Sequence, residues 1–334
     1  MADTVSKLQS APGPSRGLAA MAANMPASYF GIVLGLAGLG NAWRAAARAW
    51  ELSALVGDII HVVAALVWAV LIILYVMKAI TAPAKFVAEA EHSVQCCFVG
   101  LAGVSTMLVA GGLAPHWTAA AYVVFALGFA FTLAFGVWYT GSLWQGGRDI
   151  STTTAVLYLP TVAGSFVSAT VISALGHPEV GQLAFGAGLF SWLAMESVIL
   201  NRLLTGPTLA IPMRPTMGVQ LAPAPVGAVA YIAVSGGVPD LFVHALIGYG
   251  VLQLLILARL WRWIFEAGSV PGLWAFSFGI TAIATAPTLL TAHEDGGAIP
   301  ALAALLFVFA NIFIAALIAM TLSLITRGRM FQPA

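Results

Sequence analysis

Charged side chains are scarce in this sequence. Asp, Glu, Lys and Arg make up 7% of the 334 residues, whereas 61% are hydrophobic. Soluble domains carry about 25% charged residues, so this chain cannot cover a water-exposed surface and belongs in a membrane. The net charge is +1 and no basic run occurs, so we expect no nucleic-acid partner.

Cysteine is nearly absent as well. The two cysteines, Cys96 and Cys97, are adjacent. Neighbours in a helix point about 100° apart and rarely pair. No Cys/His spacing typical of a metal site is present. We therefore expect neither a bound metal nor a cofactor.

The motifs of intramembrane enzymes are also missing. The sequence contains no HExxH, no GxSxG and no paired Asp, which are patterns that bind zinc, carry a nucleophile or supply acid–base chemistry. A retinal-type receptor would need a lysine in the middle of a span, and none lies there. A transport protein is therefore favoured over an enzyme or a receptor.

Hydrophobic runs dominate what remains. They recur along the chain at lengths of roughly 20 residues, enough to cross about 30 Å of hydrocarbon. The alternating segments of about 10 residues that are typical of a β-barrel are absent. The sequence thus predicts an all-α polytopic membrane protein. The expected spans are 26–43, 56–80, 95–113, 118–142, 155–176, 180–204, 221–237, 241–264, 273–293 and 298–325.

The connections between these spans are short, so residues 24–326 are expected to form one membrane domain. Residues 1–23 open with a polar stretch rich in Pro, Gly and Ser. This composition predicts a disordered cytoplasmic N-terminus and lacks the apolar core of a signal peptide. Residues 327–334 are expected to form a cytoplasmic tail.

The distribution of Lys and Arg predicts the orientation. With the N-terminus inside, 11 of these residues fall on the cytoplasmic side, and only Arg44 and Arg48 fall outside. Cytoplasmic loops carry an excess of positive charge. Both termini are therefore expected in the cytoplasm, which requires an even number of spans.

Alternate spans differ in side-chain size. In the odd-numbered spans, 42 of 75 residues are Gly, Ala, Ser or Thr, against 33 of 109 in the even-numbered ones. The fourth span is an exception, with 12 of 25. The pattern favours five hairpins, with odd helices in an inner ring around a pore and even helices in an outer layer. Small residues that only tighten helix packing remain the alternative.

The positions of the prolines also distinguish odd from even spans. They lie in or at the ends of odd spans and in the interior of no even span; the residues are Pro26, Pro160, Pro223, Pro225 and Pro287. A proline frees a backbone carbonyl, and such a kink in a membrane belongs inside protein or beside a water-filled cavity. Proline in a first helical turn is also ordinary.

Three stretches carry a resemblance to a known family. They are NMPASYFGIVLGLAGLGNAW at 24–43, EHSVQCCF at 91–98 and WAFSFGIT at 274–281. The chain resembles, over residues 24–325, the tellurite-resistance/C4-dicarboxylate transporter family, which also contains the plant guard-cell slow anion channels. The resemblance implies a homotrimer in the bacterial inner membrane, with a separate pore in each ten-helix protomer.

The resemblance also implies a function. Members of the family conduct or transport small inorganic or dicarboxylate anions, and a phenylalanine on the ninth helix closes the pore. The matching residue here is Phe278, with Phe276 as the second choice. Ser93 and Gln95 depart from the family, which usually has Pro and a basic residue there. We therefore expect an anion channel, with a secondary, proton-coupled carrier or exporter of dicarboxylate, tellurite or sulfite as the alternative.

Further residues could face the pore. The aromatic and hydroxyl candidates in the odd spans are Phe30, Phe98, Ser105, Thr106, Ser165, Phe166, Ser168, Thr170, Tyr231, Ser277 and Thr281. His92 and Gln95 are expected at the inner mouth. No Lys or Arg falls deep in an expected odd span, so anions would meet only weak dipoles. Glu196, the one acid deep in a span, could couple protons or bond neighbouring helices.

Overall fold

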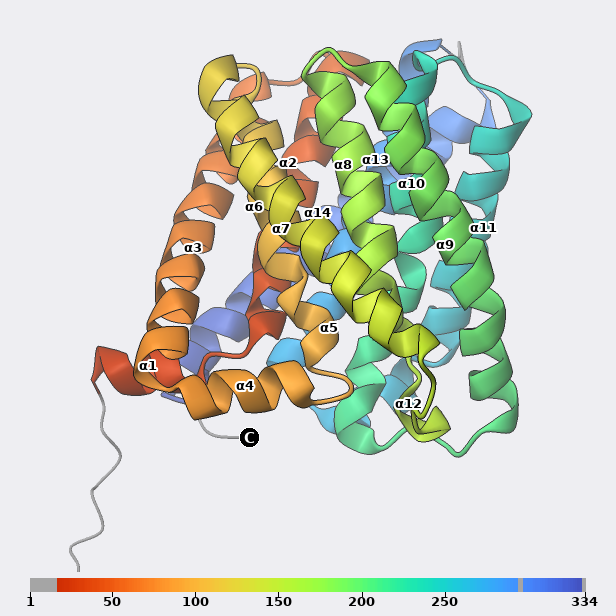
Figure 1. Ribbon diagram of the computed structural model, residues 1–334. Coiled ribbons are helices and arrows are strands. Elements are labelled where there is room, and N and C mark those ends of the chain that lie inside the picture. The colour runs from red at the N-terminus through yellow and green to blue at the C-terminus, as the bar shows by residue number, and fades with distance from the viewer. Residues whose placement is uncertain (1–16, 294–296, 332–334) are drawn as a thin grey trace, which may run out of the picture.

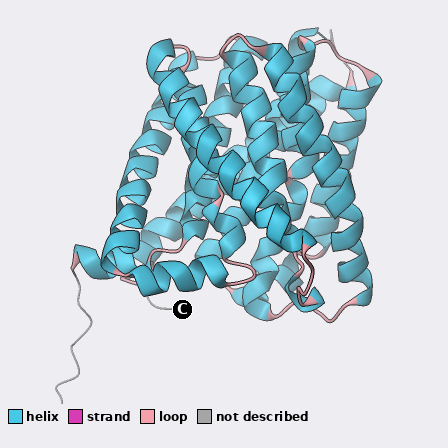
Figure 2. Cartoon of the chain, viewed as in Figure 1, coloured by secondary structure: helices cyan, strands magenta, loops and turns pink. Residues whose placement is uncertain are grey.

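The chain is helical almost throughout (Figure 2). The computed structural model describes residues 17–293 and 297–331, and no strand occurs in these ranges. Each backbone N–H and C=O group in a bilayer must find its partner within the protein, and a helix achieves this within one segment. The predicted all-α membrane fold is confirmed.

Nine segments of the described chain are long and apolar enough to cross a membrane. A tenth arises when α1 (Leu18–Asn24) and the adjoining segment Ala27–Ala49 are counted as one span, although the two meet at 91°. These segments match the ten predicted spans. Helix α1 covers part of the N-terminus that was expected to be disordered, and residues 1–16 lie outside the described ranges.

The spans fall into two structural classes. Five are long continuous helices: α3 (Ala54–Thr81), α7 (Thr118–Trp144), α9 (Pro178–Thr205), α11 (Leu241–Arg259) and α14 (Ala298–Thr326). The others are interrupted near their starts, and their main helices are α2 (Phe30–Ala49), α6 (Leu101–Leu113), α8 (Gly164–Ala174), α10 (Pro223–Ser235) and α13 (Ser277–Leu290).

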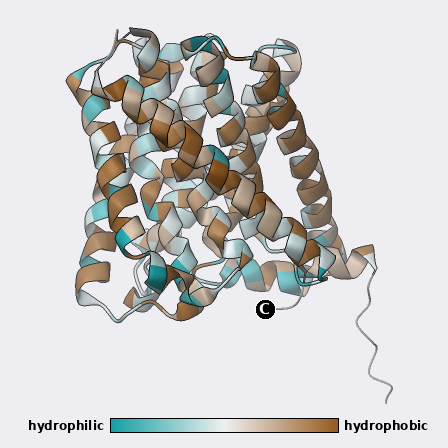
Figure 3. Cartoon of the chain, turned by 180° about the vertical axis from the view of Figure 1, so that it is seen from behind, coloured by the Kyte–Doolittle hydropathy of each residue, from teal (hydrophilic) through white to brown (hydrophobic). Residues whose placement is uncertain are grey.

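The two classes differ in burial. The continuous helices are 22–33% buried, and the interrupted spans other than α2 are 72–89% buried. Most residues of α2 are buried as well. Hydrophobic residues cover much of the length of the peripheral helices (Figure 3). The segments rich in small residues therefore lie inside the protein, and those rich in Leu, Ile and Val face the surroundings.

The interrupted spans contact one another in a closed cycle. Helix α2 packs against α6 and α13, α8 packs against α6 and α10, and α10 packs against α13. Each also packs against the continuous helix that follows it in sequence, as α2 does with α3 (Figure 1). The cycle brings residues from five distant parts of the chain to a common centre.

The interruptions have a chemical cause at several places. Pro160 lies in a π-helical turn, Leu159–Ala163, before α8. A 3₁₀ segment containing Pro215 precedes α10, and another that starts at Pro271 precedes α13. Proline removes an N–H donor and disturbs the regular α-helical ladder.

The short helices α1, α4 (Pro83–Glu91) and α12 (Trp261–Ile264) lie at the same end of the molecule as the C-terminus (Figure 1). The C-terminal residues pack back onto the start of the domain. The Tyr29 hydroxyl donates to the Met330 carbonyl, and the rings of Tyr29 and Phe331 meet edge to face at 5.8 Å. Residues 332–334 of the expected tail lie outside the described ranges.

Glycines set the separation between inner and outer helices. Gly103 of α6 faces Gly128 of α7, and a Cβ on Gly128 would lie 2.9 Å from the Gly103 carbonyl oxygen and 2.9 Å from the Met107 amide nitrogen. Such distances are below the van der Waals limit, and both contacts are backbone atoms that cannot turn aside. The approach of α6 to α7 therefore requires glycine at this position.

We expect Gly128→Ala to destabilise the protein by about 1–3 kcal/mol, because the added methyl group forces α6 and α7 apart. The measurement is the midpoint of thermal unfolding in detergent. Gly141→Ala is the matched control in the same helix, since a Cβ there would meet nothing within 4 Å. An unchanged midpoint for Gly128→Ala would contradict the assignment.

Candidate functional site

Three cavities lie in series where the interrupted spans meet, and we name them by their order along α2. The one near the C-terminal end of α2 is called the outer cavity; it has a volume of about 600 Å³ and is lined by residues of α2, α6, α8, α10 and α13. A middle cavity of about 30 Å³ and an inner cavity of about 40 Å³ are lined by residues of the same five spans. Asn41, Thr170 and Thr285 line both the outer and the middle cavity.

Phe278 occupies the division between the inner and middle cavities. It lines both, as does Val226 of α10. Its ring lies in the first turn of α13, directly after the 3₁₀ segment, and a Cβ on Gly38 of α2 would lie 3.5 Å from ring atom Cδ2. Phe278 thus borders both cavities.

Two glycines of α2 allow α13 to pack closely against it next to Phe278. A Cβ on Gly35 would lie 2.5 Å from the Ser277 hydroxyl, and one on Gly38 would lie 2.1 Å from the Thr281 hydroxyl. Larger residues at these positions would separate the two helices. The small residues of the inner spans therefore serve close packing between α2 and α13 here.

Phe276 points away from the cavities. It is 3% exposed, and its ring lies 6.2 Å from that of Phe313 on α14. A Cβ on Gly218 would touch the same ring at 2.5 Å. Phe276 therefore packs between the inner layer and α14, and it lines none of the three cavities.

Four of the predicted pore residues other than Phe278 do line these cavities. Phe98 and Phe166 line the inner one, Thr281 lines the middle one, and Thr170 lines the middle and outer ones. Ser165 and Ser168 instead line a lateral cavity of about 690 Å³ bounded by α7, α8 and α9. That cavity belongs to the periphery and not to the central series.

The remaining candidates face neighbouring helices. The Phe30 ring meets that of Tyr75 on α3 at 5.6 Å, and the Thr106 hydroxyl accepts from Trp68 Nε1 at 2.9 Å. Ser105, Tyr231 and Ser277 also lie outside the three cavities, bonded to Ala102, Asp240 and Trp274 respectively. In uniformly apolar spans, no pattern in the sequence showed which face turns to the centre.

The threonine hydroxyls on the central path already donate to the backbone. Thr170 donates to the Phe166 carbonyl at 3.0 Å, Thr281 to Ser277 at 3.0 Å and Thr285 to Thr281 at 2.7 Å. A hydroxyl has one hydrogen to give. In this conformation these groups present acceptor lone pairs and not donors to the cavities.

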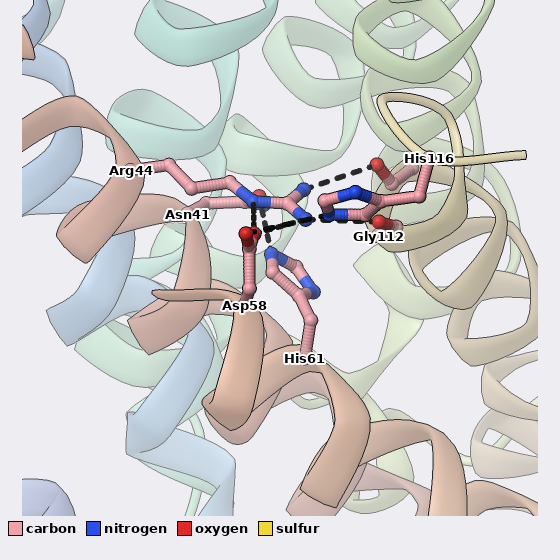
Figure 4. Close-up of polar contacts among 7 residues, drawn as sticks. Asn41, Arg44, Asp58, His61, Gly112 and His116 are labelled. Carbon is pink, nitrogen blue, oxygen red and sulfur yellow. Dashed lines mark hydrogen bonds and ion pairs between the residues drawn. The ribbon is translucent and has the colours of Figure 1, made fainter. Parts of the chain in front are cut away.

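Asn41 lines the central cavities but was not among the residues that the sequence analysis selected. It lines both the middle and outer cavities, and its Oδ1 lies 3.1 Å from Nε2 of His61 on α3 (Figure 4). His61 is 6% exposed. Because Oδ1 faces the imidazole, the two amide hydrogens on Nδ2 are left for the cavities. The polar residue at the end of an apolar run was the available signal.

Arg44 lies inside an inner span and not in the loop where its position just beyond residue 43 placed it. Helix α2 continues to Ala49 instead of ending at 43, so Arg44 lies within it. The Arg44 guanidinium pairs with Asp58 of α3 at 2.8 Å and donates to the carbonyls of Gly111 and Gly112 at 3.4 and 2.9 Å (Figure 4). It satisfies carbonyls that the end of α6 leaves free.

The segment predicted to form the inner mouth is held by hydrogen bonds to the backbone. His92 Nδ1 accepts from the backbone N–H groups of Val94 and Gln95 at 3.1 and 3.2 Å, which makes it a cap. Gln95 Oε1 is buried without a hydrogen-bond partner within the described chain. The basic side chain beside this segment is that of Arg148, whose guanidinium donates to the Ser93 carbonyl at 2.8 Å.

A buried ion pair fixes the start of α2. Lys78 Nζ lies 2.7 Å from Glu89 Oε2 and donates to the Met25 carbonyl at 2.9 Å. The other oxygen of Glu89 accepts from the Ala27 N–H at 2.7 Å. The sequence analysis counted Lys78 among the charges on the cytoplasmic side, and the structure buries it against α4. Two satisfied partners for each charge offset the desolvation cost.

Glu196 is bonded between helices. Its carboxylate accepts from Trp192 Nε1 at 2.8 Å, from Gln220 Nε2 at 3.0 Å, from the Tyr249 hydroxyl at 2.6 Å and from the Tyr158 hydroxyl. These donors come from α9, α11 and the segments before α8 and α10. Tyr158 lines the inner cavity, whereas Glu196 itself lines none of the three.

In the described chain, the possible metal ligands and the cysteines form neither a metal site nor a disulfide. No group of three or more His, Cys, Asp or Glu side chains converges there. Cys96 and Cys97 are buried free thiols, and Cys97 Sγ lies 3.2 Å from the Tyr139 hydroxyl. The centre of the described chain is therefore an apolar constriction with hydrogen-bonding groups at its wide end.

Comparison with known proteins agrees with this geometry. Residues 24–322 match the family model described as SLAC1, voltage-dependent anion channel. The chain is also 37% identical over 309 residues to the tellurite resistance protein TehA homolog of Haemophilus influenzae, which covers 92% of this chain and 93% of that protein.

The bonding of Glu196 gives a stability prediction. Glu196→Leu leaves four buried donors without an acceptor and is expected to cost about 2–4 kcal/mol of unfolding free energy. Glu196→Gln keeps an acceptor oxygen and should cost less than half as much. The readout is thermal unfolding in detergent, with Glu179→Leu on the exposed first turn of α9 as the control. Equal midpoints for all three variants would contradict a structural role.

Proposed function

Since the chain belongs to the SLAC1 family of voltage-dependent anion channels, we propose that it is a membrane channel for small anions whose path is closed by Phe278. The observation that supports the proposal is that Phe278 lines both the inner and the middle cavity. Both cavities, at about 30–40 Å³, hold no more than a few water molecules. A hydrated anion cannot pass in this conformation.

A channel is favoured over a carrier by the absence of a strong central site. Of the described residues that line the middle and inner cavities, none carries a formal charge. An anion there would be held weakly, and weak binding permits rapid flux. Movement of one aromatic side chain would open an apolar constriction of this kind without rearranging the ten spans.

The family resemblance and the charge distribution support three further proposals. The protein acts as a homotrimer in the bacterial inner membrane, and each protomer has its own path. Both termini are cytoplasmic, so the outer cavity opens to the other side of the membrane. The name of the Haemophilus influenzae relative adds tellurite to the small anions that deserve testing here.

We expect Phe278→Ala to raise anion current about tenfold or more, because it removes the ring from an apolar constriction. The measurement is current in planar bilayers under chloride, nitrate and malate gradients, with reversal potentials that report selectivity. Phe276→Ala is the matched control, since that ring packs against α14. Unchanged current in Phe278→Ala at normal membrane expression, or an equal rise in the control, would reject Phe278 as the closing residue.

The carrier alternative makes a different prediction. A proton-coupled carrier of dicarboxylate, tellurite or sulfite would need an imposed pH gradient and would lose transport in Glu196→Gln. We expect instead that the membrane potential alone drives anion uptake into liposomes, and that Glu196→Gln stays within about twofold of the unmodified protein. Loss of uptake in this variant, with its fold intact, would favour the carrier.

A further inference from the structure

One face of α2 carries three hydrogen-bond donors into the outer cavity. Asn41, Arg44 and Arg48 are spaced by three and four residues, which places them on one side of a helix. All three line the cavity of about 600 Å³, and Asn41 also lines the middle cavity. No Asp or Glu of the described chain lines either cavity.

The Arg44 guanidinium already has hydrogen-bond partners within the protein. Its guanidinium is bonded to the Asp58 carboxylate and to two carbonyls at the end of α6 (Figure 4). Asp58 also lies 3.4 Å from His116 Nε2. Arg44 therefore joins α2, α3 and α6, and the carboxylate beside it offsets much of its charge.

The Arg48 guanidinium, in contrast, has no hydrogen-bond partner within the described ranges. It is exposed in the last turn of α2, lines the same cavity, and makes no hydrogen bond or ion pair with any residue in the described ranges. Arginine near a helix C-terminus can simply bond the last carbonyls. No such bond joins Arg48 to the end of α2, where the Trp50 N–H serves the Ala46 carbonyl. Its guanidinium therefore has no partner in the described ranges and belongs to an exposed residue that lines the cavity.

Asn41 lies at the narrow end of the same face. The buried imidazole of His61 takes up its carbonyl oxygen, which leaves the amide N–H groups as side-chain donors between the outer and middle cavities. The nearby threonine hydroxyls cannot substitute, since their hydrogens are committed to the backbone. An anion that leaves water here meets the Asn41 amide first.

We propose that this face of α2 is an anion-capture site. Arg48 attracts and holds a single small anion in the outer cavity, Arg44 fixes the helix that presents it, and the Asn41 amide takes over the anion at the narrow end. The site rests on the proposed channel function and extends it, because it names which residues concentrate anions on the outer side. A positive, water-filled cavity between low-dielectric walls raises the local anion concentration.

The first test needs no current. Ala174 lines the outer cavity and is exposed, so Ala174→Cys offers a thiol for a negatively and a positively charged methanethiosulfonate reagent. At about 20 mM salt, Arg48→Gln should lower the ratio of anionic to cationic labelling rates about three- to fivefold. Near 1 M salt, where the Debye length is about 3 Å, the difference should vanish. Arg48→Lys should restore the ratio.

The second test measures current in a Phe278→Ala background. Arg48→Gln should lower anion current from the outer side about two- to fivefold at low salt only. Asn41→Asp keeps an acceptor for His61 but replaces the amide donors with a carboxylate, and should lower current about tenfold at both salt concentrations. Arg262→Gln, at the opposite end of the molecule, is the charge-matched control.

The outcomes separate the two proposals. A labelling ratio that Arg48→Gln leaves unchanged, or that Arg262→Gln lowers equally, overturns the capture site. A Phe278→Ala protein that carries no anion current overturns the channel, while the labelling test still decides the capture site. Current that is insensitive to Asn41→Asp removes Asn41 from it.

Discussion

Helix packing in a bilayer gains little from hydrophobicity, because lipid tails are as apolar as leucine. Close backbone approach is what distinguishes one helix face from another. Gly103 against Gly128, and Gly35 and Gly38 against α13, show this constraint acting directly. The spans that can come close end up inside, and the bulky spans take the positions that face lipid. The rest of the architecture depends on this sorting by size.

The same constraint governs the buried charges. Lys78, Glu89, Arg44 and Glu196 each have at least two polar partners within hydrogen-bond distance. Each joins elements that are distant in sequence, so their charge serves assembly of the fold. The described residues that line the middle and inner cavities carry no formal charge. The proposed path therefore has no charged group of the described chain in its narrow part that would retain an anion.

Sequence reasoning captured the architecture better than the individual side chains. Length and apolarity fixed the spans, and the content of small residues separated buried from exposed helices. The sequence did not predict which face of each helix turns to the centre, because spans such as the one that contains Ser105 and Thr106 are apolar on every side. The 3₁₀ and π-helical turns before α8, α10 and α13 shift the register further. Arg44 was placed outside the first span because the apolar run ends at Trp43, whereas helix α2 continues to Ala49.

The threonine hydroxyls along the cavities follow the same rule that buried polar groups are used for the fold. Each donates to a carbonyl of its own helix, and breaking such a bond costs about 1 kcal/mol net. Their hydrogens therefore stabilise α8 and α13, and only their lone pairs face the cavities. Asn41 differs, because its carbonyl oxygen faces His61 and its amide hydrogens remain for the cavities. On the proposed path, the side-chain donors for an anion are thus the amide and guanidinium groups at the wide end, and the narrow part offers a constriction without donors of this kind.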